Sequence, residues 1–192
     1  QEQDASGRVQ WKSTVEEIPV ASDEVTSDAN GKASTSFTPP QGGVYKATVR
    51  ALDAKGNEGR ASGFIWVAGP DYIPWRQTND RSFDLVTDRR SYTPGDTAEI
   101  LIASPFQGES YALVTVERGH IYRQEVLRLT SNSTLYKLPI TPGLAPNAYV
   151  SVVVVKGIDQ SNPRPNFKVG ITEIKVDTRE QEPYSFDPER VA

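Results

Sequence analysis

The chain contains no cysteine and no methionine, and only one histidine among its 192 residues. Without cysteine there can be no disulfide, no thiolate zinc site and no cysteine nucleophile. The single histidine, His120, excludes a metal site built from several histidines and disfavours a Ser-His-Asp triad. The fold must therefore be stabilised by packing, and the common enzymatic mechanisms lack the residues that they need.

Long apolar runs and massed charges are also missing. No apolar segment reaches the roughly 18 residues of a membrane span, and no signal peptide opens the chain. Position 1 is glutamine, which indicates a fragment or a processed chain. The net charge is −4 and the basic residues are scattered, whereas a nucleic-acid surface needs a basic stripe. We therefore expect neither nucleic-acid binding nor direct membrane insertion.

Helical patterns are nearly absent. No segment longer than about ten residues keeps an apolar spacing of three and four without glycine or proline. The 14 glycines and 14 prolines instead favour many short strands joined by turns. The sequence predicts an all-β fold.

The strongest β pattern lies in residues 104–157. This stretch holds three β-patterned runs, and residues 149–155 are apolar on both faces, as is typical of a central strand. About seven strands in roughly 100 residues predict a complete β-sandwich over residues 81–179. The predicted strands are 83–86, 98–102, 112–116, 121–129, 135–140, 149–155 and 170–176.

The first part of the chain offers fewer strands. A weak signal covers residues 9–20, and clearer runs cover 33–37, 45–51 and 64–67. About four strands cannot close a sandwich of roughly seven. We therefore predict that residues 1–69 form a β-domain whose opening strands are missing or lie on another chain.

Two further segments complete the predicted organisation. Residues 70–80 contain two prolines and are expected to be a linker, in which Trp75 is open enough to anchor an interface. Residues 180–192 are expected to be a tail or the first strand of a following domain.

Several carboxylate groups could be imagined as sites. Residues 28–31 and 53–58 have the composition of calcium loops, but such a loop needs more oxygen ligands and usually a distal glutamate, so plain turns are favoured. The pairs at 16–17 and 23–24 could act as general acid and base, but neighbouring carboxylates on polar segments are more typical of a solvated surface.

The remaining candidates are single residues. His120 follows a glycine between two predicted strands and is expected to be an exposed hairpin residue. Residues 132–134 match the N-glycosylation acceptor pattern in a predicted loop. Trp11, Trp66 and Trp75 could form a sugar-stacking platform, although core packing is favoured for Trp66. Motifs for phosphate loops, nucleophile elbows and dinucleotide binding are absent. We expect no catalytic residue, no cofactor and no metal site.

Several short sequence segments resemble those of a known protein family. In the first part these segments occupy residues 30–33, 37–40, 43–45, 53–57 and 66–69, and in the second part 92–98, 104–108, 112–118 and 146–157. They resemble the macroglobulin domains of the alpha-2-macroglobulin family, particularly its bacterial members. The resemblance implies tandem immunoglobulin- or fibronectin-III-like antiparallel β-sandwiches.

The resemblance also implies a function. The family comprises large secreted or periplasmic protease traps, in which cleavage of a bait segment rearranges the stacked sandwiches and a thioester captures the protease. The partners implied are neighbouring macroglobulin domains and, through the full-length protein, target proteases. The parent could be lipid-anchored through its own N-terminus. This chain would be a non-catalytic structural fragment of such an inhibitor.

The chain departs from the family pattern in two ways. The thioester motif Cys-Gly-Glu-Gln is absent, and no segment clearly corresponds to the bait region. Residues 160–166 and 178–192 are expected to be exposed and could be cut, because they hold Arg164, Arg179 and Arg190. Residues 184–188 resemble the opening of a following domain.

One alternative fits the composition equally well. The chain could be a cell-surface immunoglobulin-like adhesion or carbohydrate-binding module. A downstream thioester and bait segment in the gene would favour the protease trap, whereas glycan binding by an aromatic patch would favour the module. An enzyme is disfavoured by the lone histidine.

Overall fold

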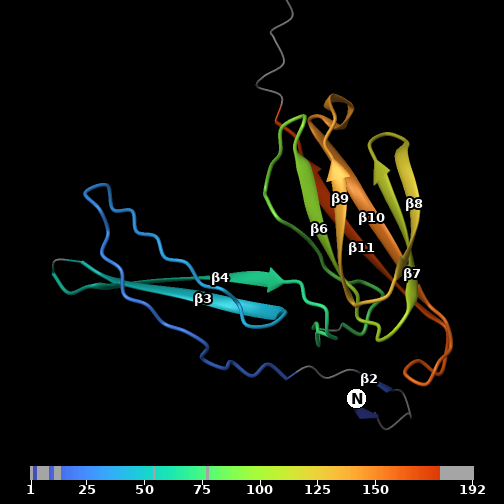
Figure 1. Ribbon diagram of the computed structural model, residues 1–192, viewed down its shortest axis with the longest axis horizontal. Helices are drawn as coiled ribbons and strands as arrows, with labels where there is room; N and C mark the ends of the chain where they lie inside the picture. Colours follow the sequence, from blue (N-terminus) through green and yellow to red (C-terminus); the bar gives the residue numbers. More distant parts are fainter. Residues whose placement is uncertain (1, 4–8, 11–13, 54, 77, 178–192) are drawn as a thin grey trace, which may run out of the picture. The chain divides into compact units, whose positions relative to one another are not determined.

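The computed structural model describes residues 2–3, 9–10, 14–53, 55–76 and 78–177. These residues form antiparallel sheets and a single short 3₁₀ turn, η1 (Pro142–Leu144), which confirms the all-β prediction (Figure 1). The chain divides into two compact units, residues 1–79 and 80–192.

The second unit is a sandwich of two sheets. The larger sheet has the strand order β11-β10-β7-β8, and the smaller one has the order β5-β6-β9 (Figure 1). The seven strands agree in number and approximate position with those predicted for this region. Their bounds are β5 Leu85–Thr87, β6 Thr97–Ala103, β7 Ser110–Glu117, β8 Ile121–Leu129, β9 Ser133–Pro139, β10 Asn147–Lys156 and β11 Asn166–Lys175.

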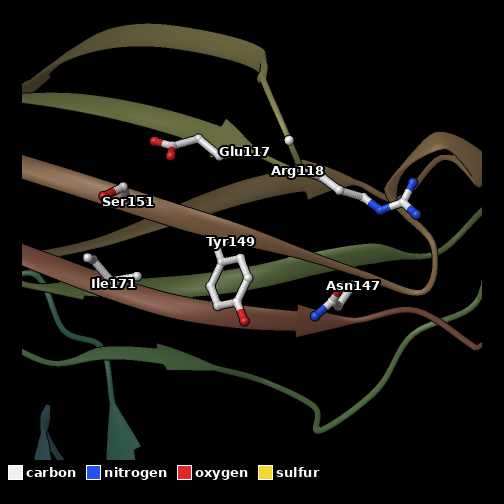
Figure 2. A pocket seen from close by; sticks show the side chains of 7 residues that line it. Glu117, Arg118, Asn147, Tyr149, Ser151 and Ile171 are labelled. Carbon is white, nitrogen blue, oxygen red and sulfur yellow. The ribbon is translucent and has the colours of Figure 1, made fainter.

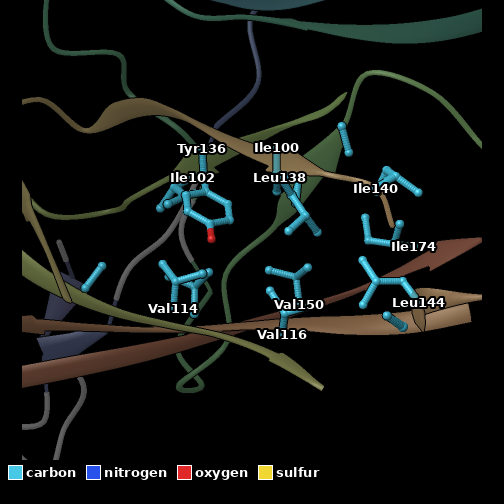
Figure 3. Close-up of a cluster of buried hydrophobic side chains, with 14 of the residues drawn as sticks. Ile100, Ile102, Val114, Val116, Tyr136, Leu138, Ile140, Leu144, Val150 and Ile174 are labelled. Atoms are coloured by element: carbon cyan, nitrogen blue, oxygen red, sulfur yellow. The ribbon is translucent and has the colours of Figure 1, made fainter. Parts of the chain in front are cut away.

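The core lies between these two sheets. Figure 3 shows Ile100, Ile102 and Tyr136 of the smaller sheet above Val114 and Val150 of the larger one. Alternate residues of each strand point inward, because successive side chains of a strand project to opposite faces. Full burial of an aliphatic side chain contributes about 1.5–3 kcal/mol, so this cluster gives the second unit a core of its own.

Strand β10 lies between β11 and β7, which confirms the prediction of a central strand. Its two faces nevertheless differ. Val150, Val152 and Val154 are fully buried, whereas Tyr149 is 47% and Val155 50% exposed. The outer residues of β10 are therefore apolar but exposed.

Gly170 allows the edge of the sandwich to close. It lies on the inner side of β11, where a Cβ would come within 2.8 Å of Leu85 Cγ and 3.0 Å of Phe83 Cζ. Phe83 is held here because its backbone N–H donates to the Val169 carbonyl oxygen (3.2 Å). A larger side chain at this position would push these packed groups apart.

Tyr92 ties the start of the second unit to its last strand. Its backbone N–H donates to the Lys175 carbonyl oxygen (2.9 Å), and its buried hydroxyl donates to Asp88 Oδ1 (2.8 Å). Burial, followed by the hydrogen bond to Asp88, raises the pKa of Tyr92 to about 12. The phenol is thus held in its neutral form.

The described part of the first unit contains two antiparallel strand pairs. The strands β1 (Glu2–Gln3) and β2 (Val9–Gln10) form one, and β3 (Gly43–Leu52) and β4 (Glu58–Val67) form the other. Two predictions fail here: residues 33–37 form no strand, and the signal over 9–20 yields only Val9–Gln10 in the described part. An alternating pattern needs a neighbouring strand to pair with, and no described strand forms a ladder with residues 33–37.

The segment after β4 packs within the first unit. Ile73 and Trp75 are buried, and the Cδ1 atom of Ile73 lies so close to Gly42 that a Cβ there would meet it at 2.4 Å. Trp75 is only 6% exposed. The expectation of an open Trp75 is therefore wrong.

Candidate functional site

The polar residues singled out in the sequence do not converge on a reactive centre. Among the described residues, no group of three or more histidine, aspartate or glutamate side chains could hold a metal ion. Within the same part of the chain, no helix is long and apolar enough to cross a membrane.

His120 lies in the connection between β7 and β8. Its carbonyl oxygen accepts the N–H of Arg118 (2.9 Å), and Gly119 has the positive φ of 70° that the tight turn requires. The exposed imidazole stacks on Tyr122 with 4.1 Å between ring centroids. This is the exposed hairpin position that the sequence predicted.

The two calcium-like loops are closed by their own aspartates. Asp28 Oδ1 accepts the backbone N–H of Asn30 (2.8 Å) and Lys32 (2.9 Å). Asp53 Oδ1 likewise accepts the backbone N–H of Asn57 (2.8 Å), while the Asn57 side-chain amide donates to Oδ2 (2.7 Å). These bonds, led by the Asn57 amide, lower the pKa of Asp53. Both loops are turns, as the sequence favoured.

The carboxylate pairs lie apart on the exposed surface of the first unit. Glu17 forms an ion pair with Lys46 (2.7 Å), and Asp23 Oδ2 accepts the Thr35 hydroxyl (2.5 Å). One carboxylate of each pair therefore has a partner of its own. Exposed ion pairs of this kind contribute about 0–1 kcal/mol.

The surroundings of Trp66, Trp75 and Asn132 differ from those of a sugar-stacking platform or a glycosylation site. Trp66 is half-buried and tilted against Phe64 (6.3 Å between ring centroids), Trp75 is buried, and Trp11 lies outside the described residues. Asn132, in the turn between β8 and β9, is only 3% exposed. A glycan could not be attached there without local opening.

The loop between β10 and β11 is held by a buried lysine. Lys156 is 2% exposed, and its ammonium donates to the Glu109 carbonyl oxygen (2.8 Å) and pairs with Asp159. Asp159 also accepts the backbone N–H of Ser161 (2.8 Å) and Asn162 (2.9 Å). The bond from Lys156, followed by that from Ser161, lowers the pKa of Asp159 to about 2. The predicted cleavable segment 160–166 thus begins in a hydrogen-bonded loop.

The outer face of the β11-β10-β7-β8 sheet carries many exposed apolar side chains. Register places Val169, Val153, Leu113 and Val126 side by side in one row across all four strands. Phe167, Val155 and Tyr111 form the next row. We call the following set the outer face: Tyr111, Leu113, Val126, Tyr149, Val153, Val155, Phe167, Val169 and Ile171.

Charged groups lie at the edge of this outer face. Arg128 pairs with Glu109 (2.5 Å) beside Tyr111. The Arg123–Glu125 pair (2.9 Å) lies on the opposite side of β8, because these residues are in register with the inward-facing Val116 and Val114. The hydrogen bond from Arg128 lowers the pKa of Glu109, so this pair stays ionised. The Arg81 guanidinium lies 4.6 Å from the Phe167 ring centroid. An apolar centre with a polar rim is typical of a protein–protein interface.

A shallow depression lies at one end of the outer face. Figure 2 shows its lining side chains, which come from β7, β10 and β11 and from the turns beside them. Tyr149 lies between Asn147 and Ile171, and the Asn147 amide donates to Glu173 (2.8 Å). The depression can receive a side chain of a partner, but it brings together no acid, base and nucleophile.

Comparisons with known proteins identify the family of this chain. The family model described as "Alpha-2-macroglobulin bait region domain" matches residues 83–189, which include all seven strands of the second unit. The chain belongs to the alpha-2-macroglobulin family. The sequence alone had shown no segment that corresponds to the bait region. The match corrects that expectation, because it assigns residues 83–189 to the bait region domain.

Relatives within the family are bacterial proteins. The "Alpha-2-macroglobulin homolog" of a Nostoc species is 31% identical over 159 residues, covering 83% of this chain and 8% of the relative. The "Alpha-2-macroglobulin" of Ralstonia nicotianae is 34% identical over 142 residues, covering 69% of this chain and 8% of the relative. That of Escherichia coli is 32% identical over 125 residues, covering 60% of this chain and 7% of the relative. The chain thus spans about a twelfth of the length of these relatives.

Sequence reasoning missed the outer face as a feature. It took the apolar outer residues of residues 149–155 as a sign of a central strand rather than of an available surface. The signal was present, because Leu113, Val126 and Ile171 are apolar side chains on the faces of their strands opposite the buried residues. Apolar residues at outward positions on several paired strands, read together, would have indicated the surface.

Proposed function

We propose that this chain is a non-catalytic structural part of a bacterial protease inhibitor of the alpha-2-macroglobulin type. In this proposal the parent protein is periplasmic or extracellular and traps proteases after its bait segment is cleaved. The observation that carries the proposal is the match of the bait region domain to a sandwich that has its own core and an uncovered apolar outer face.

The outer face is proposed to contact another β-domain of the parent polypeptide. Because the chain spans only about 8% of its relatives' length, most of the parent's surface lies outside it. An apolar centre with the Arg128–Glu109 ion pair and Arg81 at its edge suits a neighbouring protein domain. A rigid sandwich can transmit a displacement from one neighbour to the next. Such contacts would transmit a displacement caused by bait cleavage to other domains of the parent.

The loop between β10 and β11 is not proposed as the bait segment. A protease needs an extended, locally free backbone, and this loop is closed by Asp159 and anchored to the buried Lys156. The second cleavable segment of the sequence analysis, residues 178–192, lies outside the described residues.

One pair of variants tests the contact in the full-length parent. Ile171 is on the outer face and is 64% exposed, whereas Ile158 is in the β10–β11 loop and is 69% exposed. Ile171→Asp is expected to reduce protease capture, measured as covalent or sodium-dodecyl-sulfate-resistant complexes, by about tenfold or more, which corresponds to at least about 1.4 kcal/mol. Ile158→Asp serves as the control and should leave capture unchanged.

Both variants should leave the stability of the isolated 192-residue chain unchanged. Equal capture by the two variants would contradict the role of the outer face. The isolated chain is also expected not to inhibit trypsin. Stoichiometric inhibition by it, or specific glycan binding, would contradict the proposed structural role.

A further inference from the structure

The larger sheet of the second unit differs at its two edges. At the β11 edge, the Val169 N–H donates to the Arg81 carbonyl oxygen (2.7 Å), and the Phe83 N–H donates to the Val169 carbonyl oxygen (3.2 Å). Further along this edge, the Tyr92 N–H donates to the Lys175 carbonyl oxygen (2.9 Å). At the opposite edge, β8 pairs with β7 alone among the described residues (Figure 1). The backbone groups on the free side of β8 are therefore open to an added strand.

The charged side chains of β8 limit which strand can be added. Arg123 and Glu125 lie on the inner side of the strand, because they are in register with buried residues of β7. They pair with each other (2.9 Å), and the Arg123 guanidinium lies 6.0 Å from the Tyr136 ring centroid. Inward-pointing charges on an edge strand normally discourage pairing, because an apolar partner desolvates them and supplies no opposite charge. An added strand must therefore bring opposite charges to these two positions.

A second copy of β8 brings these charges in one register. When two copies pair antiparallel about a two-fold axis through Gln124, residues equally far from Gln124 on either side face each other. Arg123 of one copy then faces Glu125 of the other, and the symmetry repeats this pair. On the outer side of the sheet Tyr122 faces Val126, and an aromatic residue opposite a β-branched one is a favourable cross-strand pair.

The neighbouring registers are less favourable. A two-fold axis through Arg123 or through Glu125 places like charges directly opposite each other, which destabilises a sheet. An axis between two residues would place the inner side chains of one copy beside the outer side chains of the other. The order Arg123-Gln124-Glu125 therefore favours one register and one partner.

We infer that β8 is a self-complementary edge through which two copies of this chain associate, joining their larger sheets into one continuous antiparallel sheet. The same strand serves both copies, so the interface is isologous and association stops at the dimer. Edge pairing buries a small area, so the dimer is weak and depends on concentration. Strand addition uses the backbone edge of β8 rather than the outer face, so the dimer does not rest on the contact proposed for that face.

Charge reversal tests the pairing in the 192-residue chain. Sedimentation equilibrium of the original chain at low ionic strength should show a monomer–dimer equilibrium. Arg123→Glu and Glu125→Arg should each weaken association by at least about tenfold, because each places like charges opposite each other twice in the dimer. The two variants change the net charge in opposite directions, so a general effect of net charge cannot weaken both.

Two combinations restore the complementary order. The double variant Arg123→Glu/Glu125→Arg exchanges the two charges and should associate like the original chain. An equimolar mixture of the two single variants should form a heterodimer, because each charge of one chain then faces an opposite charge of the other. Lys137→Glu is the matched control, since it changes the net charge as Arg123→Glu does but lies on β9 of the other sheet. It should leave association unchanged.

Folding and the place of the contact are measured separately. Each variant should keep the melting temperature of the original chain within about 3 °C, because the exchanged side chains are partly exposed. Hydrogen exchange of the β8 amides in the original chain should slow as the protein concentration rises, a measurement that needs no variant.

Three results would overturn the inference. The first is an original chain that stays monomeric at about 1 mM, with exchange in β8 independent of concentration. The second is association that the single charge reversals leave unchanged. The third is association lost in the single variants and restored in neither combination, because the pairing would then not be centred on Gln124.

Discussion

The two units of this chain have similar sequence patterns but different structures. Both contain alternating strands joined by aspartate- and glycine-containing turns. In the second unit the inward residues of seven strands meet and are buried, whereas in the described part of the first unit β3 and β4 pair only with each other and most of their side chains are exposed. Alternation therefore determines which side of a strand is apolar, but burial depends on whether a partner is present.

The largest expected effect compares one isoleucine from each unit. Ile102 is fully buried between the sheets, and Ile65 of β4 is 54% exposed. Ile102→Ala should lower the free energy of unfolding by about 2–5 kcal/mol, because it removes buried methyl groups and leaves a cavity. Ile65→Ala should change it by less than about 0.5 kcal/mol. Urea unfolding of the 192-residue chain measures both, and equal losses would break the comparison.

Two glycines, one from each unit, test the same comparison with a smaller expected change in stability. An added Cβ at Gly170 meets Phe83 and Leu85, whereas one at Gly63 of β4 meets nothing within 4 Å. Gly170→Ala should destabilise the second unit by about 1–3 kcal/mol through overpacking. Gly63→Ala should be within about 0.5 kcal/mol of the original chain in the same unfolding experiment. A tolerated Gly170→Ala would mean that this edge of the sandwich is loosely packed.

Two tyrosines of the second unit test whether burial of a polar group stabilises only with a partner. The Tyr92 hydroxyl donates to Asp88, whereas the Tyr136 hydroxyl has no hydrogen-bond partner in the core. Tyr92→Phe should cost about 1 kcal/mol, and Tyr136→Phe should be neutral or stabilising. Thermal unfolding at neutral pH distinguishes them, and a loss in Tyr136→Phe as large as that in Tyr92→Phe would contradict this explanation.

Tyr92 also predicts a response to alkaline pH. Its folded-state pKa of about 12 lies above the ordinary value of 10.0, so its contribution to stability is complete below pH 10 and is lost as the pH rises through 12. Between these values the original chain should lose stability more steeply than Tyr92→Phe. Parallel curves for the two proteins would show that the phenol is not held in this way.

The smallest expected effect concerns two loops, one in each unit. Asp159 closes the β10–β11 loop and Asp53 closes the β3–β4 loop, but only the first is anchored to a buried lysine. Thermolysin should cut the original chain slowly at Ile158 and several times faster after Asp159→Asn. Cleavage in β3–β4 should be fast already and change little with Asp53→Asn. Rapid cleavage at Ile158 in the original chain would contradict the anchoring.

Acidic pH should break the ion pair between Lys156 and Asp159. The pKa of Asp159, about 2, lies below the ordinary 3.8, so its contribution is complete above about pH 4 and is lost as the pH falls through 2. Pepsin cleavage of the β10–β11 loop should therefore accelerate between pH 4 and pH 2. In Asp159→Asn this acceleration should be absent.

The sequence predicted the second unit well because its signals were local. Alternation in β7 and turn residues around His120 each act over a few positions, and seven such strands are enough to close a sandwich. It failed for residues 33–37, because an alternating pattern forms a strand only beside a pairing partner, and no described strand pairs with this segment. It also failed for Trp75, because burial depends on what lies opposite a side chain rather than on its own segment. The outer face emerged only when the register of four strands was known.

Hydrogen exchange of the 192-residue chain, read strand by strand, tests the central contrast most directly. Amides of β7 and β10 are expected to exchange only with global unfolding of the second unit, whereas those of β3 and β4 should exchange orders of magnitude faster, since in the described part of the chain these two strands pair only with each other and most of their side chains are exposed. Equally slow exchange in β3–β4 would show that the first unit is complete without its parent, and would contradict the account.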